Sequence, residues 1–129
     1  MAAIQIGVTS VSSQLREARH TLRDRLGTDL GLERDHRDAL ASVANELLGA
    51  ALDARVGEPL MLSVELFPRL SSVRVRCPSD VELRDEPFGM RERVLRGFAF
   101  AWGKRSYTDG SVDLWAEVAR PAVGRTAGQ

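Results

Sequence analysis

The stretch LMLSVELFPRLSSVRVRC, residues 60–77, decides the fold class. In its first half every second residue is apolar, which is the period of a β-strand with one buried face; these residues are Leu60, Leu62, Val64 and Leu66. The pair Pro68 and Arg69 indicates a turn, after which Val73, Val75 and Cys77 alternate with arginines. The stretch therefore predicts an antiparallel hairpin with one solvent-facing side.

Two amphipathic helices and a short strand are predicted before this hairpin. Ile4, Ile6 and Val8 alternate as in an edge strand. Apolar residues then recur at spacings of three and four in two segments, first at Leu15, Ala18, Leu22 and Leu26, then at Leu40, Val43, Ala44, Leu47, Leu48 and Ala51. This spacing is typical of helices with one buried face. Gly27 is a natural C-cap for the first helix.

The pattern after the hairpin predicts one more helix and two more strands. Val94, Leu95, Phe98 and Ala101 lie at helical spacing within residues 90–102, and alternation returns over residues 112–118, with a preceding strand at 104–107. The order is strand, helix, helix, strand, strand, helix, strand, strand. We therefore expect an α+β fold: a two-layer α/β sandwich with a mixed, mostly antiparallel sheet and helices on one face.

Length and composition limit the classes of protein to which this chain can belong. A chain of 129 residues forms a single domain, which we expect over residues 1–120, with a disordered tail at 121–129. A lone cysteine, Cys77, and the lack of a signal peptide or membrane span predict a cytoplasmic protein. Eighteen basic residues balance eighteen acidic ones, which argues against nucleic-acid binding. We expect Cys77 to be buried, and His20 and His36 to lie on the surface.

Four segments carry a resemblance to a known family: VSSQLREAR at residues 11–19, NELLGAA at 45–51, FAFAWG at 98–103 and GSVDLWAE at 110–117. They resemble the small anti-sigma-factor serine/threonine kinases of the histidine-kinase-like ATPase (GHKL) superfamily. The resemblance spans most of the chain. It implies a Bergerat-type sandwich that binds ATP and Mg²⁺, and a protein partner such as a sigma factor or an anti-anti-sigma-type protein.

The nucleotide motifs that the resemblance implies are eroded. Glu46 matches the family's catalytic carboxylate, but Ala50 stands where an Asn oxygen holds Mg²⁺, and a methyl group binds no cation. Asp80 lies one position from the expected adenine-binding Asp, in a stretch without glycine. Gly89 matches the first glycine of a phosphate-binding turn, whereas Arg91 replaces the second. Glu46, Asp80 and Gly89 are therefore read as relics of catalytic and nucleotide-binding residues, with no metal ligand left at position 50.

These features favour a non-catalytic regulatory protein, a pseudokinase that binds a protein partner or a second copy of itself, without nucleic acid or membrane. Two alternatives remain open. One is an ATP-dependent serine/threonine kinase that uses Glu46, with ATP and Mg²⁺ as cofactors. The other is a small-molecule sensor that uses the former nucleotide pocket.

Several side chains have both a functional and a plain structural interpretation. Arg91, Arg93 and Arg96 either bind phosphate or form a solvated helix face. Trp102 is expected in the core. Met61, Phe67 and Trp115 are predicted on the strand faces opposite the core, where exposed apolar side chains often mark a partner surface.

Overall fold

A computed structural model describes residues 2–8, 12–54, 59–78 and 87–120. Its elements follow the predicted order: β1 (Ala2–Val8), α1 (Ser12–Thr28), α2 (Arg34–Asp53), β2 (Leu60–Leu66), β3 (Leu70–Cys77), the 3₁₀ turn η1 (Gly89–Arg91), α3 (Glu92–Phe98), β4 (Ala101–Ser106) and β5 (Val112–Ala119). The described chain is an α+β fold with three α-helices and one five-stranded sheet. The predicted tail at 121–129 and Asp80 lie outside the described residues.

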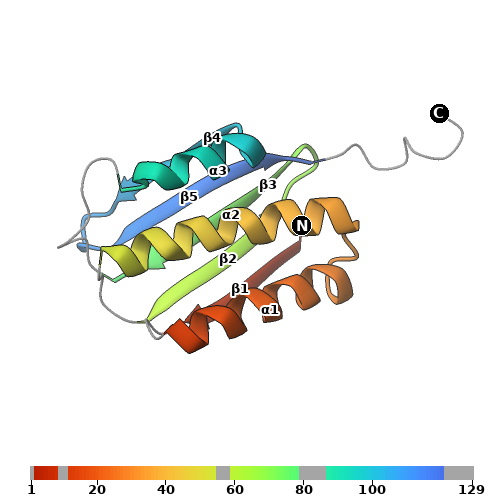
Figure 1. Ribbon diagram of the computed structural model, residues 1–129, viewed down its shortest axis with the longest axis horizontal. Helices are drawn as coiled ribbons and strands as arrows, with labels where there is room; N and C mark the ends of the chain where they lie inside the picture. Colours follow the sequence, from red (N-terminus) through yellow and green to blue (C-terminus); the bar gives the residue numbers. More distant parts are fainter. Residues whose placement is uncertain (1, 9–11, 55–58, 79–86, 121–129) are drawn as a thin grey trace, which may run out of the picture.

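The five strands form one sheet in the order β1-β2-β3-β5-β4, and every neighbouring pair is antiparallel. The predicted hairpin is β2 and β3, with Leu62 opposite Val75 and Val64 opposite Val73. β1 lies at one edge and pairs only with β2, as its alternation indicated. Figure 1 shows all three helices on one face of this sheet, with α2 across the middle strands.

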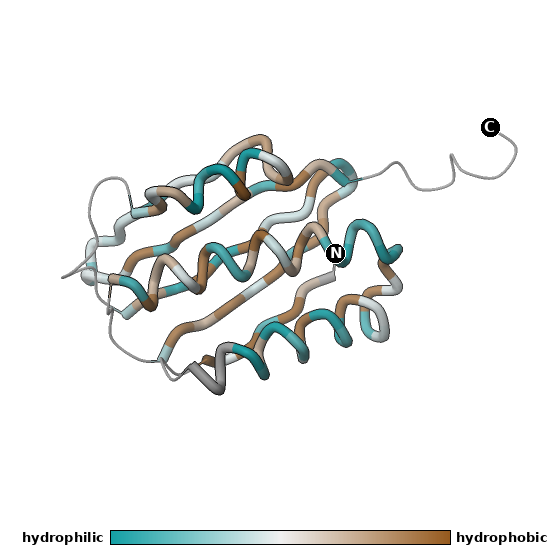
Figure 2. The backbone as a smooth tube through the Cα atoms, in the orientation of Figure 1, coloured by the Kyte–Doolittle hydropathy of each residue, from teal (hydrophilic) through white to brown (hydrophobic). Residues whose placement is uncertain are grey.

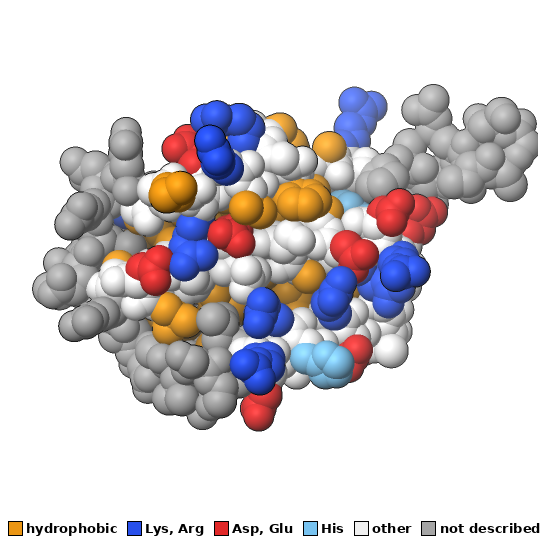
Figure 3. All heavy atoms as spheres, in the orientation of Figure 1, with side chains coloured by type: hydrophobic (Ala, Val, Ile, Leu, Met, Phe, Trp, Pro, Cys, Tyr) orange, Lys and Arg blue, Asp and Glu red, His pale blue; other side chains and the backbone are white. Residues whose placement is uncertain are grey.

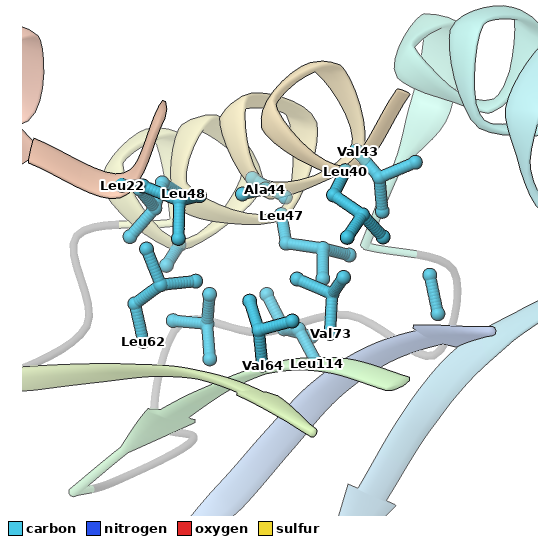
Figure 4. Close-up of a cluster of buried hydrophobic side chains, with 14 of the residues drawn as sticks. Leu22, Leu40, Val43, Ala44, Leu47, Leu48, Leu62, Val64, Val73 and Leu114 are labelled. Carbon is cyan, nitrogen blue, oxygen red and sulfur yellow. The ribbon is translucent and has the colours of Figure 1, made fainter. Parts of the chain in front are cut away.

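The core lies between that helical layer and the sheet. Leucine, valine and alanine side chains of α1 and α2 point onto apolar side chains of the strands, and the ten labelled in Figure 4 are Leu22, Leu40, Val43, Ala44, Leu47, Leu48, Leu62, Val64, Val73 and Leu114. Along α1 and α2 hydrophobic residues recur every three or four positions, and along β1, β2, β3 and β5 they alternate with more polar residues (Figure 2). The two periods seen in the sequence thus identify the two surfaces that pack together.

Three local predictions are wrong. The helix expected over 90–102 ends at Phe98, and residue 101 begins β4; the backbone N–H of Phe100 already donates to the carbonyl of Glu117 on β5, so sheet pairing overrides the helical spacing. α1 continues through Gly27 to Thr28, and the left-handed glycine after it is Gly31 (φ 63°). His36 is buried rather than on the surface.

Two single-residue predictions are confirmed, one fully and one in part. Cys77 is completely buried on the core face of β3. Trp102 is half-buried and packs against the core from β4, a strand rather than the expected helix.

Candidate functional site

The candidate site is built on the face of α2 that carries Glu46, Gly49 and Asp53. Residues three and four apart on a helix lie on the same side, so the two carboxylates flank the glycine. The side chain of Glu46 is only 12% exposed, whereas that of Asp53 is 70% exposed. One carboxylate therefore lies at the bottom of the site and the other at its rim.

Arg91 binds both carboxylates from the opposite side of the site. Its Nη1 lies 3.2 Å from Oε1 of Glu46, and its Nη2 and Nε lie 2.8 and 3.2 Å from Oδ2 of Asp53. Burial lowers the pKa of Arg91, but hydrogen bonds and the charge of Asp53, followed by those of Glu46, outweigh this effect and hold the pKa above the usual arginine value. The guanidinium is therefore a permanent cation between two carboxylates.

The guanidinium also lies directly on Gly49. An ideal Cβ at this position would lie 2.5 Å from Cζ and from Nη1 of Arg91, closer than any real Cβ contact. A glycine inside a helix costs about 0.5–1 kcal/mol relative to alanine. A Cβ here would require the guanidinium of Arg91 to move from its present position. We call Glu46, Gly49, Asp53 and Arg91 the arginine clamp.

The segment before α3 delivers Arg91 to the clamp. Phe88 is buried and anchors this segment, and its carbonyl accepts a hydrogen bond from the backbone N–H of Arg91 at 2.9 Å. Gly89 between them has φ 54°, a conformation that glycine adopts without strain. The turn geometry thus accounts for Gly89 independently of any phosphate.

Glu46 is fully engaged in hydrogen bonds. Besides the contact with Arg91, its second oxygen accepts from Nδ2 of the neighbouring Asn45 at 3.1 Å. Ala50, at the position where the family resemblance implies a magnesium ligand, is buried in the hydrophobic core. These residues do not fit a magnesium–nucleotide ligand set, because position 50 offers no oxygen and the available carboxylates already bind a cation.

A small cavity borders Gly89 on the side away from the clamp. Its volume is about 180 Å³, and it is lined by Pro87, Phe88, Gly89, Glu92, Trp102, Gly103 and Lys104. Pockets for drug-sized ligands usually measure about 300–1,000 Å³. Gly89 lines this cavity, and Glu46 does not.

The other two arginines weighed as phosphate ligands differ from Arg91. Arg96 pairs with Glu92 one turn earlier at 3.6 Å, and Arg93 is exposed. Neither the role of Asp53 nor the arginine clamp was predicted from the sequence. The available signal was a glycine in the middle of a helix with carboxylates three residues before and four residues after it.

Met61, Phe67 and Trp115 are separated from one another by the sheet register. Met61 is the second residue of β2 whereas Phe67 follows its last residue, and Trp115 lies two strands away, opposite Arg74. Arg74 pairs with Glu65, and Arg76 pairs with Asp113, whose Oδ2 also accepts from the Tyr107 hydroxyl at 2.7 Å. Charged pairs therefore divide this face of the sheet. The indole of Trp115 lies against Gly103.

Another set of exposed apolar side chains lies on η1, on α3 and just after it. Met90, Val94 and Phe98 follow one another at intervals of four residues along η1 and α3, and Phe100 comes just after. Met90 is 85% exposed and Phe100 is 59% exposed, while Leu95 is the only buried residue of α3. We call these four residues the α3 stripe; hydrophobic side chains are visible along α3 in Figure 3.

The described residues hold no cluster of three or more His, Cys, Asp or Glu side chains suited to a metal ion. Within the same part of the chain, no helix has the length and hydropathy that a bilayer crossing requires. No protein-family model matches this chain, and no curated protein matches it in sequence.

Proposed function

We propose that this chain is a non-catalytic regulatory protein that resembles the anti-sigma-factor kinases of the GHKL superfamily and acts by binding a protein partner. The observation that carries the proposal is the arginine clamp. A guanidinium occupies the surface of α2 next to Glu46 and pairs with both carboxylates. A magnesium–nucleotide complex would have to displace this internal cation, and Ala50 would contribute no ligand in return.

The α3 stripe supports a protein partner. Large apolar side chains exposed close together in the sequence are unfavourable in water, and exposed apolar patches commonly mark protein–protein interfaces. By resemblance, the partner is a sigma factor or an anti-anti-sigma-type protein. The surface of Met61, Phe67 and Trp115 is a second candidate interface, although charged pairs interrupt it.

Titration of the full chain with Mg-ATP tests the non-catalytic assignment. A ligand at a hundred times its dissociation constant raises the free energy of unfolding by about 2.7 kcal/mol, which thermal unfolding detects readily. We expect no change at millimolar Mg-ATP. A rise that Glu46→Ala abolishes would instead support the kinase alternative, and a rise that Glu46→Ala leaves intact would support a sensor that binds the nucleotide in the former pocket without using Glu46.

Co-elution with sigma factors and anti-anti-sigma-type proteins of the same genome tests the partner. If the α3 stripe is the interface, Phe98→Ser weakens the complex at least tenfold, because partly exposed aromatic residues are frequent interface hot spots. Met61→Ser is the matched variant on the sheet face and leaves the affinity unchanged. The reverse pattern would assign the interface to the sheet. No complex with any of these proteins would contradict the proposed partner class.

A further inference from the structure

A groove of about 400 Å³ runs between α1 and α2 on the outer side of the helical layer. Four residues of each helix line it, in both cases at positions i, i+3, i+4 and i+7, which form one side of a helix. They are Arg16, Arg19, His20 and Arg23 from α1, and Asp38, Ala41, Ser42 and Asn45 from α2. Figure 3 shows basic side chains gathered over this seam, with a histidine beside them.

The groove carries more positive charge than its own acidic residue neutralises. Asp38 is its only carboxylate and pairs with Arg23 at 2.6 Å, while His20 faces Asp24 outside the groove at 3.6 Å. Within the described part of the chain, Arg16 and Arg19 pair with no carboxylate. Like charges one turn apart on a helix repel each other, so helix stability does not explain this arrangement.

Arg19 also carries one donor that lacks a partner in the described chain. Its Nε–H is buried and has no hydrogen-bond acceptor among the described residues, as is also true of Arg37 outside the groove. Buried donors in proteins nearly always have a partner, because removing a donor from water without replacing its hydrogen bond is unfavourable. Because this Nε atom is inaccessible to solvent, an anion in the open groove would neutralise the excess charge rather than bond to this donor.

We propose that this groove binds a phosphate monoester. Guanidinium groups pair with phosphate through two parallel hydrogen bonds, and the terminal oxygens of one phosphate suffice for both Arg16 and Arg19, whereas a carboxylate has only two oxygens. The Ser42 hydroxyl and the Asn45 amide add neutral donors. Among the described residues that line it there is no Phe, Tyr or Trp and Ala41 is the one apolar side chain, so the charge of the ligand dominates its recognition.

This site is separate from the arginine clamp, since none of the clamp residues lines the groove. Asn45 is the one link, because it lines the groove and donates to Glu46. The phosphate monoester has two possible sources with the same chemistry, a small phosphorylated metabolite or a phosphorylated serine of a protein. The probes below distinguish them.

The test is calorimetric titration of the full chain with glycerol 3-phosphate and with a short phosphoserine peptide. Glycerol, the unphosphorylated peptide, and sulfate and succinate at equal ionic strength are the control ligands. Arg16→Gln and Arg19→Gln each remove one guanidinium, and Ser42→Glu adds a competing carboxylate without removing an arginine. Arg93→Gln, on exposed α3, changes the net charge by the same amount away from the groove.

We expect both phosphate monoesters to bind and the control ligands not to bind. Each groove variant should weaken binding about tenfold or more, as the loss of charge-assisted hydrogen bonds implies, while Arg93→Gln leaves it unchanged. Tighter binding of the phosphopeptide identifies a phosphorylated protein as the source, and equal affinities identify a metabolite. Equal binding of sulfate or succinate, or binding that survives the groove variants, would overturn the proposal.

Discussion

At Gly49 a residue of low helix propensity leaves room for the pairing of Arg91 with Glu46 and Asp53. Alanine at position 49 would be the better helix former by about 1 kcal/mol. Its Cβ would meet the guanidinium, however, and would push it away from Glu46, whose carboxylate is largely buried. The favoured residue at this position therefore depends on whether the arginine is present.

We predict that the effect of Gly49→Ala on the free energy of unfolding has opposite signs in the native chain and in an Arg91→Ala variant. In the native chain it lowers the free energy of unfolding, because hydrogen bonds to a charged group contribute about 1.5–3 kcal/mol and exceed the gain in helix propensity. In an Arg91→Ala background the same substitution raises the free energy of unfolding by about 0.5–1 kcal/mol. Urea unfolding of the four proteins measures this coupling as a double-mutant cycle. Stabilisation in both backgrounds would contradict the clamp.

At the scale of elements, His36 links α2 to the sheet. Its Nε2 lies 2.9 Å from the hydroxyl of the fully buried Ser71 on β3. Burial disfavours the charged ring and lowers the pKa of His36, the nearby Arg120 lowers it further, and Glu33 opposes this only in part. The folded protein therefore holds His36 neutral more strongly than the unfolded chain does.

This preference predicts a pH dependence of stability with a defined sign. In the unfolded chain His36 takes up its proton near its ordinary pKa of about 6.5, whereas in the folded protein it does so only at lower pH. The unfolded state thus binds more protons in this window, and the free energy of unfolding falls as the pH is lowered from about 7.5 to about 5.5.

Urea unfolding at both pH values checks this prediction, with His36→Gln as the control. The variant keeps a polar side chain near Ser71 but does not titrate, so its stability should change less between the two pH values. Arginine partners lower the pKa of the buried Asp113 and of the exposed Asp38, so both carboxyl groups titrate below this window. An equal pH response in the variant would remove His36 as the cause.

At the scale of the whole molecule, Cys77 reports on opening of the central sheet. It is fully buried, it is paired with Val112 on β5, and burial, followed by the charge of Asp113, raises the pKa of its thiol to about 12. The thiolate is the reactive form, and it is both disfavoured and inaccessible in the folded protein.

We predict that a thiol reagent at about pH 8 modifies folded protein at least 10³-fold more slowly than unfolded protein. A domain of ordinary stability is open in fewer than about one molecule in a thousand, and only the open form exposes the thiol. Cys77 is the only cysteine, so the signal has one source. The rate should rise with urea in parallel with global unfolding. Rapid labelling without denaturant would show instead that β3 separates locally from β5.

The sequence by itself determined the order of the elements and the faces that become buried. Alternation at residues 60–77 and helical spacing at residues 40–51 are repeated local patterns, and each identifies an apolar face that must pack. The end of α3 was missed because pairing of Phe100 and Ala101 with β5 competes with a local helical pattern. Such competition depends on residues far away in the chain.

Only the tertiary structure decided the arginine clamp, the burial of His36 and the groove between α1 and α2. Arg91 is 45 residues from Glu46 and 38 from Asp53, and His36 is 35 from Ser71. Periodicity records which side of an element is apolar, but not which polar side chains of two elements meet. A long arginine side chain pairs with whatever carboxylate the packed helices bring within its reach, so its partner is set by the packing of the whole molecule.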